Sequence, residues 1–251
     1  MTNLRTARVT QDRTLDLPRA KLVERVDYTD DLMVIKLEPQ DLDFNFNPGQ
    51  YCTLGLEGIE RAYSIVSAPH EPLLEIFVEL VPDGQLTPLM WQMGTGDTMS
   101  IRPGPKGIFV MDPTVNQHLM LGTVTGTAPF VSIVRDHLHY NRSGHHFYIL
   151  EGASYVDEFV YDTELLDLSA AHPDVVTFVP AISRPNEARN AAWEGETGRL
   201  NAIVAKYLHQ FKLDQSDTLV YACGHPGMIE GSREIVAGEG WKWTEERFWK
   251  E

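Results

Sequence analysis

The rest of the chain can be interpreted around one stretch, Arg61-Ala62-Tyr63-Ser64-Ile65-Val66-Ser67-Ala68-Pro69. Its alternation predicts a β-strand whose neighbouring side chains point to opposite faces. Such a strand suits a ligand with a phosphate at one end and a planar ring at the other. Arg61 can hold a phosphate through paired hydrogen bonds, Tyr63 can lie against a ring, and Ser64 can hydrogen-bond a ring heteroatom. Taken alone, the stretch also fits a surface arginine beside a half-buried tyrosine.

The first half of the chain consists of short alternating segments separated by turn residues. The predicted strands are residues 21–27, 32–38, 51–56, 61–67, 74–80 and 98–103. Many short strands without intervening helices indicate an antiparallel barrel. One helix interrupts them at residues 87–93. Its start, Gly84-Gln85-Leu86-Thr87, directs free backbone N–H groups at an anion or simply links two strands.

The second half alternates strands with helices. The predicted strands are residues 118–123, 145–151, 175–180 and 218–223, and the predicted helices are 128–139, 157–168, 199–211 and 226–237. This series predicts an open parallel sheet covered on both faces, in which ligands bind at the carboxyl ends of the strands. Those ends fall at residues 123–127, 152–154, 182–184 and 223–226. We therefore predict an extension over residues 1–18, a barrel domain over 19–112 and an α/β domain over 113–251.

Composition excludes several classes of function. With 251 residues, 43% of them hydrophobic and 23% charged, the chain is expected to be a soluble globular protein. We expect a cytoplasmic protein, since neither a membrane span of about 20 apolar residues nor a secretory leader is visible. Cys52 and Cys223 form no Cys-x-x-Cys pair, which argues against a four-cysteine iron–sulfur cluster. The nine histidines show no metal-ligand spacing, and a net charge of −15 disfavours nucleic-acid binding.

Four further stretches accompany the first one: Pro48-Gly49-Gln50-Tyr51, Gly84-Gln85-Leu86-Thr87, residues 122–130 and Cys223-Gly224-His225-Pro226-Gly227-Met228. In this order and spacing they resemble the ferredoxin–NADP reductase family, its bacterial branch most closely, over residues 21–249. The resemblance implies that the barrel binds FAD and the α/β domain binds NADP. It also implies an oxidoreductase that passes electrons between NADPH and ferredoxin or flavodoxin by hydride transfer to or from the flavin.

The resemblance assigns roles to individual residues. For FAD they are Arg61, Ala62, Tyr63, Ser64, Gly84, Leu86, Thr87, Thr125, Phe248 and Trp249. For NADP they are Thr127, Ser154, Ser183, Arg184, Arg199, Gly224, Pro226 and Met228. Ser64 and Cys223 are placed at the reacting centre, with Cys223 positioning the nicotinamide rather than acting as a nucleophile, because hydride transfer is the cofactors' own chemistry. The alternative for Cys223 is a small buried hydrophobic residue.

Several positions depart from the family pattern. Val124 stands where the family often has glycine, and Ser154 stands where some bacterial relatives carry another arginine. Arg184 and Arg199 still predict a 2′-phosphate site and a preference for NADPH, unless they are surface arginines in salt bridges. Glu187 leaves the alternative of a pocket selective for NADH, because such pockets use an acidic group to bind the ribose hydroxyls.

The C-terminal aromatic residues are expected to be ordered, because large apolar side chains are rarely exposed in a free tail. By resemblance one of them stacks on FAD, and Trp249 is favoured modestly over Phe248 because Lys250 and Glu251 extend the chain beyond the family's aromatic pair. The alternative is that they pin the last strand to the sheet.

The acceptor is the least determined feature. An acidic carrier requires a basic face, which Lys36, Arg102, Lys106 and Arg142 could provide despite the net charge of −15. One alternative function is the reduction of free flavins or other small acceptors. A second is a non-catalytic partner subunit that binds FAD or a nucleotide.

Overall fold

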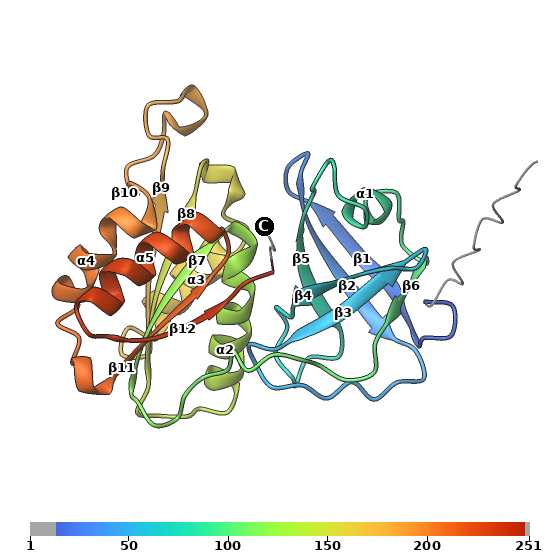
Figure 1. The fold of residues 1–251 in the computed structure, drawn as a ribbon, viewed down its shortest axis with the longest axis horizontal. Coiled ribbons are helices and arrows are strands. Elements are labelled where there is room, and N and C mark those ends of the chain that lie inside the picture. The colour runs from blue at the N-terminus through green and yellow to red at the C-terminus, as the bar shows by residue number, and fades with distance from the viewer. Residues whose placement is uncertain (1–13, 249–251) are drawn as a thin grey trace, which may run out of the picture.

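Two six-stranded sheets make up the molecule and stand side by side along its long axis (Figure 1). The computed structural model describes residues 14–248. The first sheet is antiparallel, with strand order β4-β3-β6-β1-β2-β5. Its strands are β1 (Arg19–Asp27), β2 (Leu32–Pro39), β3 (Tyr51–Leu56), β4 (Ile59–Ser64), β5 (Leu74–Glu79) and β6 (Thr98–Ile101).

The antiparallel sheet curls until its two edges meet. Ile65, just after β4, forms a bridge with Ile76 of β5, and the Val66 N–H donates to the Glu75 carbonyl at 2.8 Å. Alternate side chains fill the interior, among them Leu54, Ile65 and Ile76, which are all fully buried. This arrangement confirms the predicted antiparallel barrel.

The barrel helix α1 (Thr87–Met90) is shorter than predicted. Arg25 of β1 donates hydrogen bonds of 2.9 Å to the carbonyls of Trp91 and Met93. A side chain from a distant strand thus satisfies carbonyls after the last helical turn. The predicted end at residue 93 is therefore wrong by three residues.

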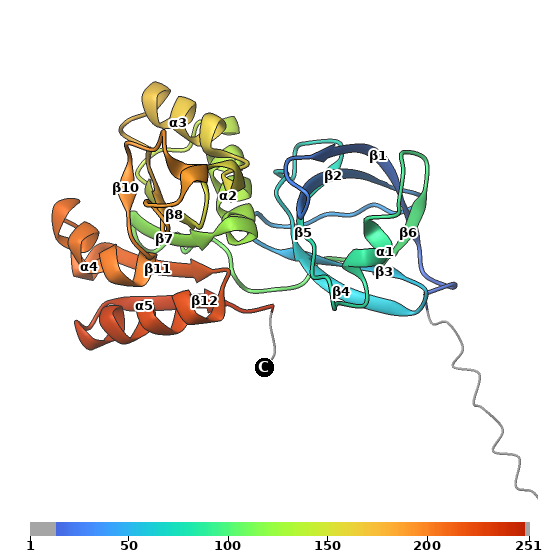
Figure 2. The same ribbon diagram turned by 90° about the horizontal axis from the view of Figure 1, so that it is seen from above.

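The second sheet is parallel, with strand order β10-β9-β8-β7-β11-β12. Its strands are β7 (Gln117–Thr123), β8 (His146–Ala153), β9 (Val176–Ile182), β10 (Glu196–Thr197), β11 (Thr218–Cys223) and β12 (Lys242–Glu246). Helices α2 (Ala128–His139) and α3 (Asp162–Ala171) cover one face, and α4 (Leu200–Gln210) and α5 (Pro226–Gly238) cover the other (Figure 2). The predicted doubly covered parallel sheet is confirmed. None of the described helices is long and apolar enough to cross a membrane.

Other predicted boundaries also differ from the structure. The strand predicted over residues 61–67 is β4 (Ile59–Ser64), and the strand predicted over residues 98–103 is β6 (Thr98–Ile101). Helix α3 begins at Asp162 instead of residue 157, because a short 3-10 helix, η2 (Val156–Glu158), precedes it. The edge strands β10 and β12 were absent from the predicted set. β10 has two residues, and β12 (Lys-Trp-Thr-Glu-Glu) carries too few apolar residues to show alternation.

A buried polar cluster joins the barrel to the parallel sheet. Tyr161 donates its hydroxyl hydrogen bond to Glu75 Oε1 at 2.8 Å, and Ser132 donates to the Ser67 carbonyl at 2.8 Å. Arg135 of α2 lies 3.3 Å from Glu75 and makes two 2.7 Å hydrogen bonds to Glu164. Apolar side chains from β2, β5, α2 and α3 form one continuous core around these contacts. The two domains are therefore packed together rather than merely tethered.

We predict that Arg135→Met lowers the free energy of unfolding by about 2–4 kcal/mol, because it leaves the Glu75 carboxylate buried without its cation. Urea unfolding followed by circular dichroism measures this loss, and adding Glu75→Gln should recover most of it. The control is Arg189→Met, which removes a closer ion pair, with Asp157 at 2.8 Å, whose two side chains are 42% and 47% exposed. That change should cost less than about 1 kcal/mol. Equal losses for the two variants would contradict a special role for the buried cluster.

Candidate active site

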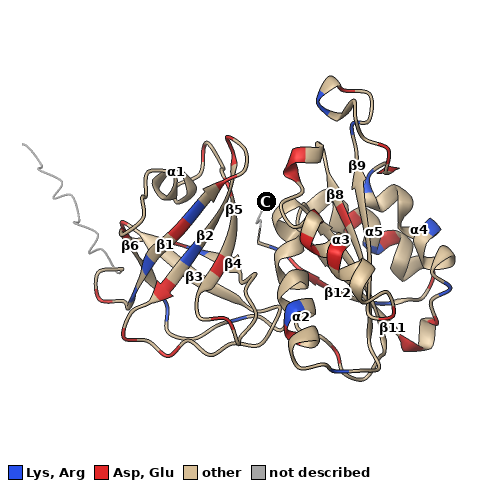
Figure 3. Cartoon of the chain, turned by 180° about the vertical axis from the view of Figure 1, so that it is seen from behind, with Lys and Arg blue, Asp and Glu red and all other residues tan. Residues whose placement is uncertain are grey.

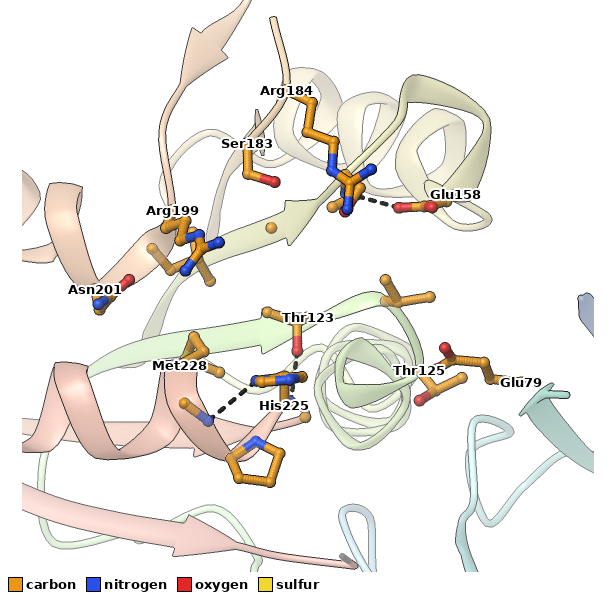
Figure 4. Close-up of a pocket in the computed structure, with 18 of the residues that line it drawn as sticks. Glu79, Thr123, Thr125, Glu158, Ser183, Arg184, Arg199, Asn201, His225 and Met228 are labelled. Carbon is orange, nitrogen blue, oxygen red and sulfur yellow. Dashed lines mark hydrogen bonds between the residues drawn. The ribbon is translucent and has the colours of Figure 1, made fainter. Parts of the chain in front are cut away.

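A cavity of about 760 Å³ opens where the parallel sheet faces the barrel (Figure 4). The carboxyl ends of the parallel strands line it, as the sequence predicted, through residues 123–125, 152–154, 183–184, 198–201 and 224–228. The barrel adds Asp31, Leu32 and Glu79. Both domains therefore contribute to one site.

The glycine-rich turn, η1 (Val124–Thr127), packs tightly against the end of β11. A Cβ atom on Gly126 would lie 2.2 Å from the Cys223 carbonyl oxygen, so only glycine allows this approach. The His225 N–H donates to Thr123 Oγ1 at 2.7 Å and ties the two loops together. Val124 has a φ of +47°, a left-handed conformation that favours glycine and is strained for a β-branched residue. The departure from the family pattern at this position is therefore accommodated by backbone strain.

The two residues predicted for the reacting centre come together from different domains. Ser64 Oγ is buried without a hydrogen-bond partner among the described residues. The pKa of the Cys223 thiol is raised by burial and by the Glu246 carboxylate, while the nearby Ser64 hydroxyl lowers it slightly. Ser64 is the last residue of β4 and Cys223 the last of β11, and the two side chains are close enough to interact. The structure thus joins Ser64 and Cys223 at the domain boundary.

Glu246 is a third member of this centre that sequence reasoning missed. Parallel pairing of β11 with β12 sets Glu246 directly beside Cys223. Its Oε2 is buried and has no hydrogen-bond partner among the described residues, and burial raises the pKa of its carboxyl to about 8. The only sequence signal was a carboxylate two positions before Phe248. The side chains of Ser64, Cys223 and Glu246 therefore leave hydrogen-bonding atoms available for the polar edge of a ring between the two domains.

β4 (Ile59–Ser64) carries the residues predicted for the barrel site, and its tyrosine is packed against the barrel core. Arg61 Nη2 donates to Gln85 Oε1 at 3.2 Å, so its guanidinium lies beside the turn at residues 84–87. Tyr63 packs against the barrel core, and its hydroxyl lies 3.2 Å from Met90 Sδ. Burial raises the Tyr63 pKa. Ala62 is half-buried beside it.

The turn at residues 84–87 presents main-chain groups to a ligand, because the side chains of Leu86 and Thr87 are buried. Leu86 is 1% exposed and belongs to the barrel core. Thr87 is also buried, and its Oγ1 accepts a hydrogen bond from the Val81 N–H at 2.9 Å. A Cβ atom on Gly84 would lie 2.9 Å from the Val81 carbonyl oxygen. A ligand beside Arg61 would therefore contact the main chain of this turn.

Most of the residues predicted for NADP line the cavity. They are Ser154, Ser183, Arg184, Arg199, Gly224, Pro226 and Met228, joined by Thr125 from the FAD set. Thr127 is fully buried, with its hydroxyl unpartnered among the described residues, and lies behind the lining. Arg184 is exposed and donates to the Tyr155 hydroxyl at 2.7 Å.

The C-terminal aromatic residue that the structure describes lies on another side chain. The ring of Phe248 meets Tyr51 edge to face, with centroids 5.5 Å apart. Tyr51 pairs with Ser64 across β3 and β4, so Phe248 reaches the reacting centre's surroundings. Trp249, the favoured stacking residue, lies outside the described residues.

The expected basic face is largely neutralised. Lys36 pairs with Glu24, Arg102 with Glu60 and Arg142 with Asp136. Lys and Arg are spread over both domains and interspersed with Asp and Glu (Figure 3). Three of the four candidate cations are thus already engaged with a carboxylate.

Glu151 is an ionisable group buried behind the cavity. It pairs with Gly122 in the β7–β8 register and is 0% exposed. Neither carboxyl oxygen has a hydrogen-bond partner among the described residues. Burial raises the pKa of this carboxyl from 4.5 to about 8, and a weaker contribution from the Thr127 hydroxyl lowers it. The folded protein therefore favours a protonated Glu151.

Comparison with known families agrees with this two-part site. The family described as "Oxidoreductase FAD-binding domain" matches residues 19–111, and the one described as "Oxidoreductase NAD-binding domain" matches residues 120–234. The barrel is thus an FAD-binding domain and the parallel sheet is a nicotinamide-dinucleotide-binding domain.

Curated relatives carry two kinds of name. A ferredoxin–NADP reductase from Azotobacter vinelandii is 31% identical over 215 residues, which cover 78% of this chain and 80% of that protein. A flavodoxin/ferredoxin–NADP reductase from Escherichia coli is 26% identical over 228 residues, covering 87% and 89%. Protein RfbI from Salmonella typhimurium is 31% identical over 209 residues, but these cover 81% of this chain and only 59% of that protein.

Solved structures share the fold. A ferredoxin NADP+ reductase from Neisseria gonorrhoeae with bound FAD and NADP superposes with a TM-score of 0.80 at 24% identity, covering 92% of this chain and 98% of that one. The ferredoxin reductase in carbazole 1,9a-dioxygenase gives 0.77 at 23% identity, covering 92% and 69%.

We predict that Arg61→Ala gives a folded protein with weakened FAD binding. Losing a charged hydrogen-bonding partner costs about 1.5–3 kcal/mol, or roughly tenfold to a hundredfold in affinity. Flavin content after purification and a fluorescence titration with FAD measure the change. An unchanged affinity would show that this strand does not hold the phosphates.

We predict that Glu151→Gln stabilises the protein at high pH. Because the folded-state pKa is raised to about 8, the stabilising contribution of the protonated form is complete below pH 4.5 and is lost as pH rises through 8. The glutamine variant cannot ionise, so it should gain on the order of 3–5 kcal/mol over wild type at pH 9 and almost nothing at pH 4. Unfolding curves from pH 4 to 9 measure this, with the exposed Glu234→Gln as control. Parallel pH profiles for wild type and Glu151→Gln would refute the prediction.

Proposed function

This chain belongs to the ferredoxin–NADP reductase family, and we propose that it passes electrons between NADPH and a separate one-electron carrier, ferredoxin or flavodoxin, by way of FAD. The observation that carries the proposal is the centre formed by Ser64, Cys223 and Glu246, where the barrel meets the nucleotide cavity. Bound FAD supplies the chemistry: it accepts a hydride and can release the two electrons one at a time. We place this reaction in the cytoplasm, where Cys52 and Cys223 remain thiols.

The residues of the chain position the reactants and hold a proton. The Ser64 hydroxyl and the Glu246 carboxyl offer hydrogen bonds to the polar edge of a ring. With a pKa raised to about 8, Glu246 is mostly protonated at neutral pH and can donate from its carboxyl. Cys223 fills the adjoining space as a positioning residue, and its burial keeps water away from the centre.

The nucleotide is held by the turn and by two arginines. The turn at η1 precedes the 12-residue helix α2, whose N-terminus favours a diphosphate. Arg184 and Arg199 line the same cavity and are assigned to the 2′-phosphate of NADPH. Thr125 and Cys223, at the boundary with the barrel, would then position the nicotinamide.

A second function is favoured by the charge distribution. The net charge is −15, and Lys36, Arg102 and Arg142 are each paired with a carboxylate. An acidic carrier would meet little free positive charge there, whereas a free flavin or another small acceptor requires no basic face. Reduction of small acceptors is therefore the alternative to carrier reduction.

Anaerobic titration of the FAD-loaded protein tests the function. NADPH should bleach the flavin absorbance, and adding ferredoxin or flavodoxin should restore it faster than adding free FMN. Faster reoxidation by FMN would select the small-acceptor function. A flavin that stays oxidised with NADPH would leave a non-catalytic binding subunit.

We predict that Glu246→Gln slows flavin reduction by NADPH at least tenfold. Receiving a hydride gives the ring a negative charge, which the Glu246 carboxylic acid would neutralise by donating its proton. Loss of such a donor typically costs a factor of about 10²–10⁴, and the amide retains part of the hydrogen bonding. In wild type the rate should fall as pH rises through about 8, where Glu246 loses its proton. The variant should lose that pH dependence. Stopped-flow absorbance between pH 6 and 9 measures both effects, and a variant that keeps the wild-type profile would remove Glu246 from the reaction.

A further inference from the structure

The carboxylate of Glu158 occupies an anion-binding position in the nucleotide cavity. Its Oε2 accepts hydrogen bonds from the backbone N–H groups of Ser154, at 2.7 Å, and Tyr155, at 3.1 Å. Both residues directly follow β8, whose carboxyl end lines the cavity, and Glu158 itself is part of the lining (Figure 4). Two N–H groups that could donate to a phosphate oxygen therefore already donate to an anion supplied by the chain itself.

The nearby guanidinium group of Arg184 is also engaged. It donates to the Tyr155 hydroxyl at 2.7 Å and lies 3.5 Å from a Glu187 oxygen. The Tyr155 hydroxyl in turn donates to Glu187 at 2.6 Å. The Arg184 pKa is raised by Tyr155 first and further by Glu187 and Glu158. The positive charge of Arg184 is therefore shared with two carboxylates before any nucleotide arrives.

The charged groups of the whole cavity lining also disfavour an additional phosphate. Its carboxylates are Asp31, Glu79 and Glu158, and its guanidinium groups are Arg184 and Arg199. A 2′-phosphate adds a charge of about −1.5 to −2 at neutral pH, by analogy with other phosphate monoesters. A ribose with a free 2′-hydroxyl adds no charge and can donate a hydrogen bond to a carboxylate.

We propose that Glu158 determines nucleotide choice, by weakening the hold on a 2′-phosphate and accepting a ribose hydroxyl, so that NADH is used beside NADPH. The proposal rests on the proposed function only in requiring that this cavity bind the nucleotide. Arg184 and Arg199 favour the phosphate, and Glu158 opposes them within the same pocket.

The variant Glu158→Gln tests this assignment. Its side-chain carbonyl can still accept from the Ser154 and Tyr155 N–H groups, so the loop keeps its cap while one negative charge is lost. The matched control is Glu234→Gln, an exposed position on α5 outside the cavity lining that changes the net charge equally. Both variants are prepared as FAD-loaded holoenzyme.

Calorimetry should measure the affinity of each protein for adenosine 2′,5′-bisphosphate and for 5′-AMP, and kinetics should give kcat/KM for NADPH and NADH. Removing a like charge from the cavity that would hold the phosphate should tighten the bisphosphate by about tenfold. The NADPH to NADH ratio should rise by a similar factor, mainly through the KM for NADPH. AMP and NADH should bind no tighter, and Glu234→Gln should match wild type.

The outcomes separate this inference from the function beneath it. Binding of both nucleotides with an unchanged ratio in Glu158→Gln would overturn the role of Glu158 and leave the proposed function standing. An equal shift in Glu234→Gln would also overturn it, because the effect would then be one of net charge. Binding of neither nucleotide by wild type would overturn both.

Discussion

The buried carboxylate of Glu75 is the contact on which the rest of the structure depends. It belongs to the barrel, yet it receives the Tyr161 hydroxyl and the Arg135 guanidinium from the other domain. The reacting centre is divided in the same way, with Ser64 on the barrel side and Cys223 and Glu246 on the sheet. A shift of one domain against the other would separate these groups, and misplacement by about 1 Å can cost on the order of a hundredfold in rate. The interface therefore fixes the geometry that the chemistry requires.

Ionisable groups buried around the site show what that geometry costs. Glu151 and Glu246 each have a pKa raised to about 8 by burial. Both carboxyl oxygens of Glu151 and one of Glu246 have no hydrogen-bond partner among the described residues. Both carboxyl groups lower the free energy of unfolding as the pH rises, which an apolar side chain in the same place would not do. Only Glu246 lies at the reacting centre, beside Cys223. Glu151 lies behind the turn that borders the cavity, and its destabilising burial serves no step of the proposed reaction.

Local pattern was enough to predict the two sheets, the turn before α2 and the strand ends that line the cavity. Alternation and glycine-rich turns are encoded by neighbouring residues, whereas the hydrogen bond between Arg61 and Gln85 forms only when the barrel closes. The contacts that were missed are non-local. Glu246 comes to lie beside Cys223 through parallel pairing at a sheet edge, and an arginine on β1 donates to the carbonyls that follow α1. The engagement of Arg184 by Tyr155 and Glu187, and the capping by Glu158, likewise depend on loops that meet only in the folded chain.

We propose that the domain boundary brings a nicotinamide against a flavin for direct hydride transfer. The most direct measurement is rapid anaerobic mixing of the FAD-loaded protein with NADPH that carries deuterium at the transferable C4 position. Our account predicts complete bleaching of the flavin, at a rate that deuterium lowers in a single kinetic phase. A flavin that remains oxidised, or that bleaches at a rate indifferent to deuterium, would contradict it.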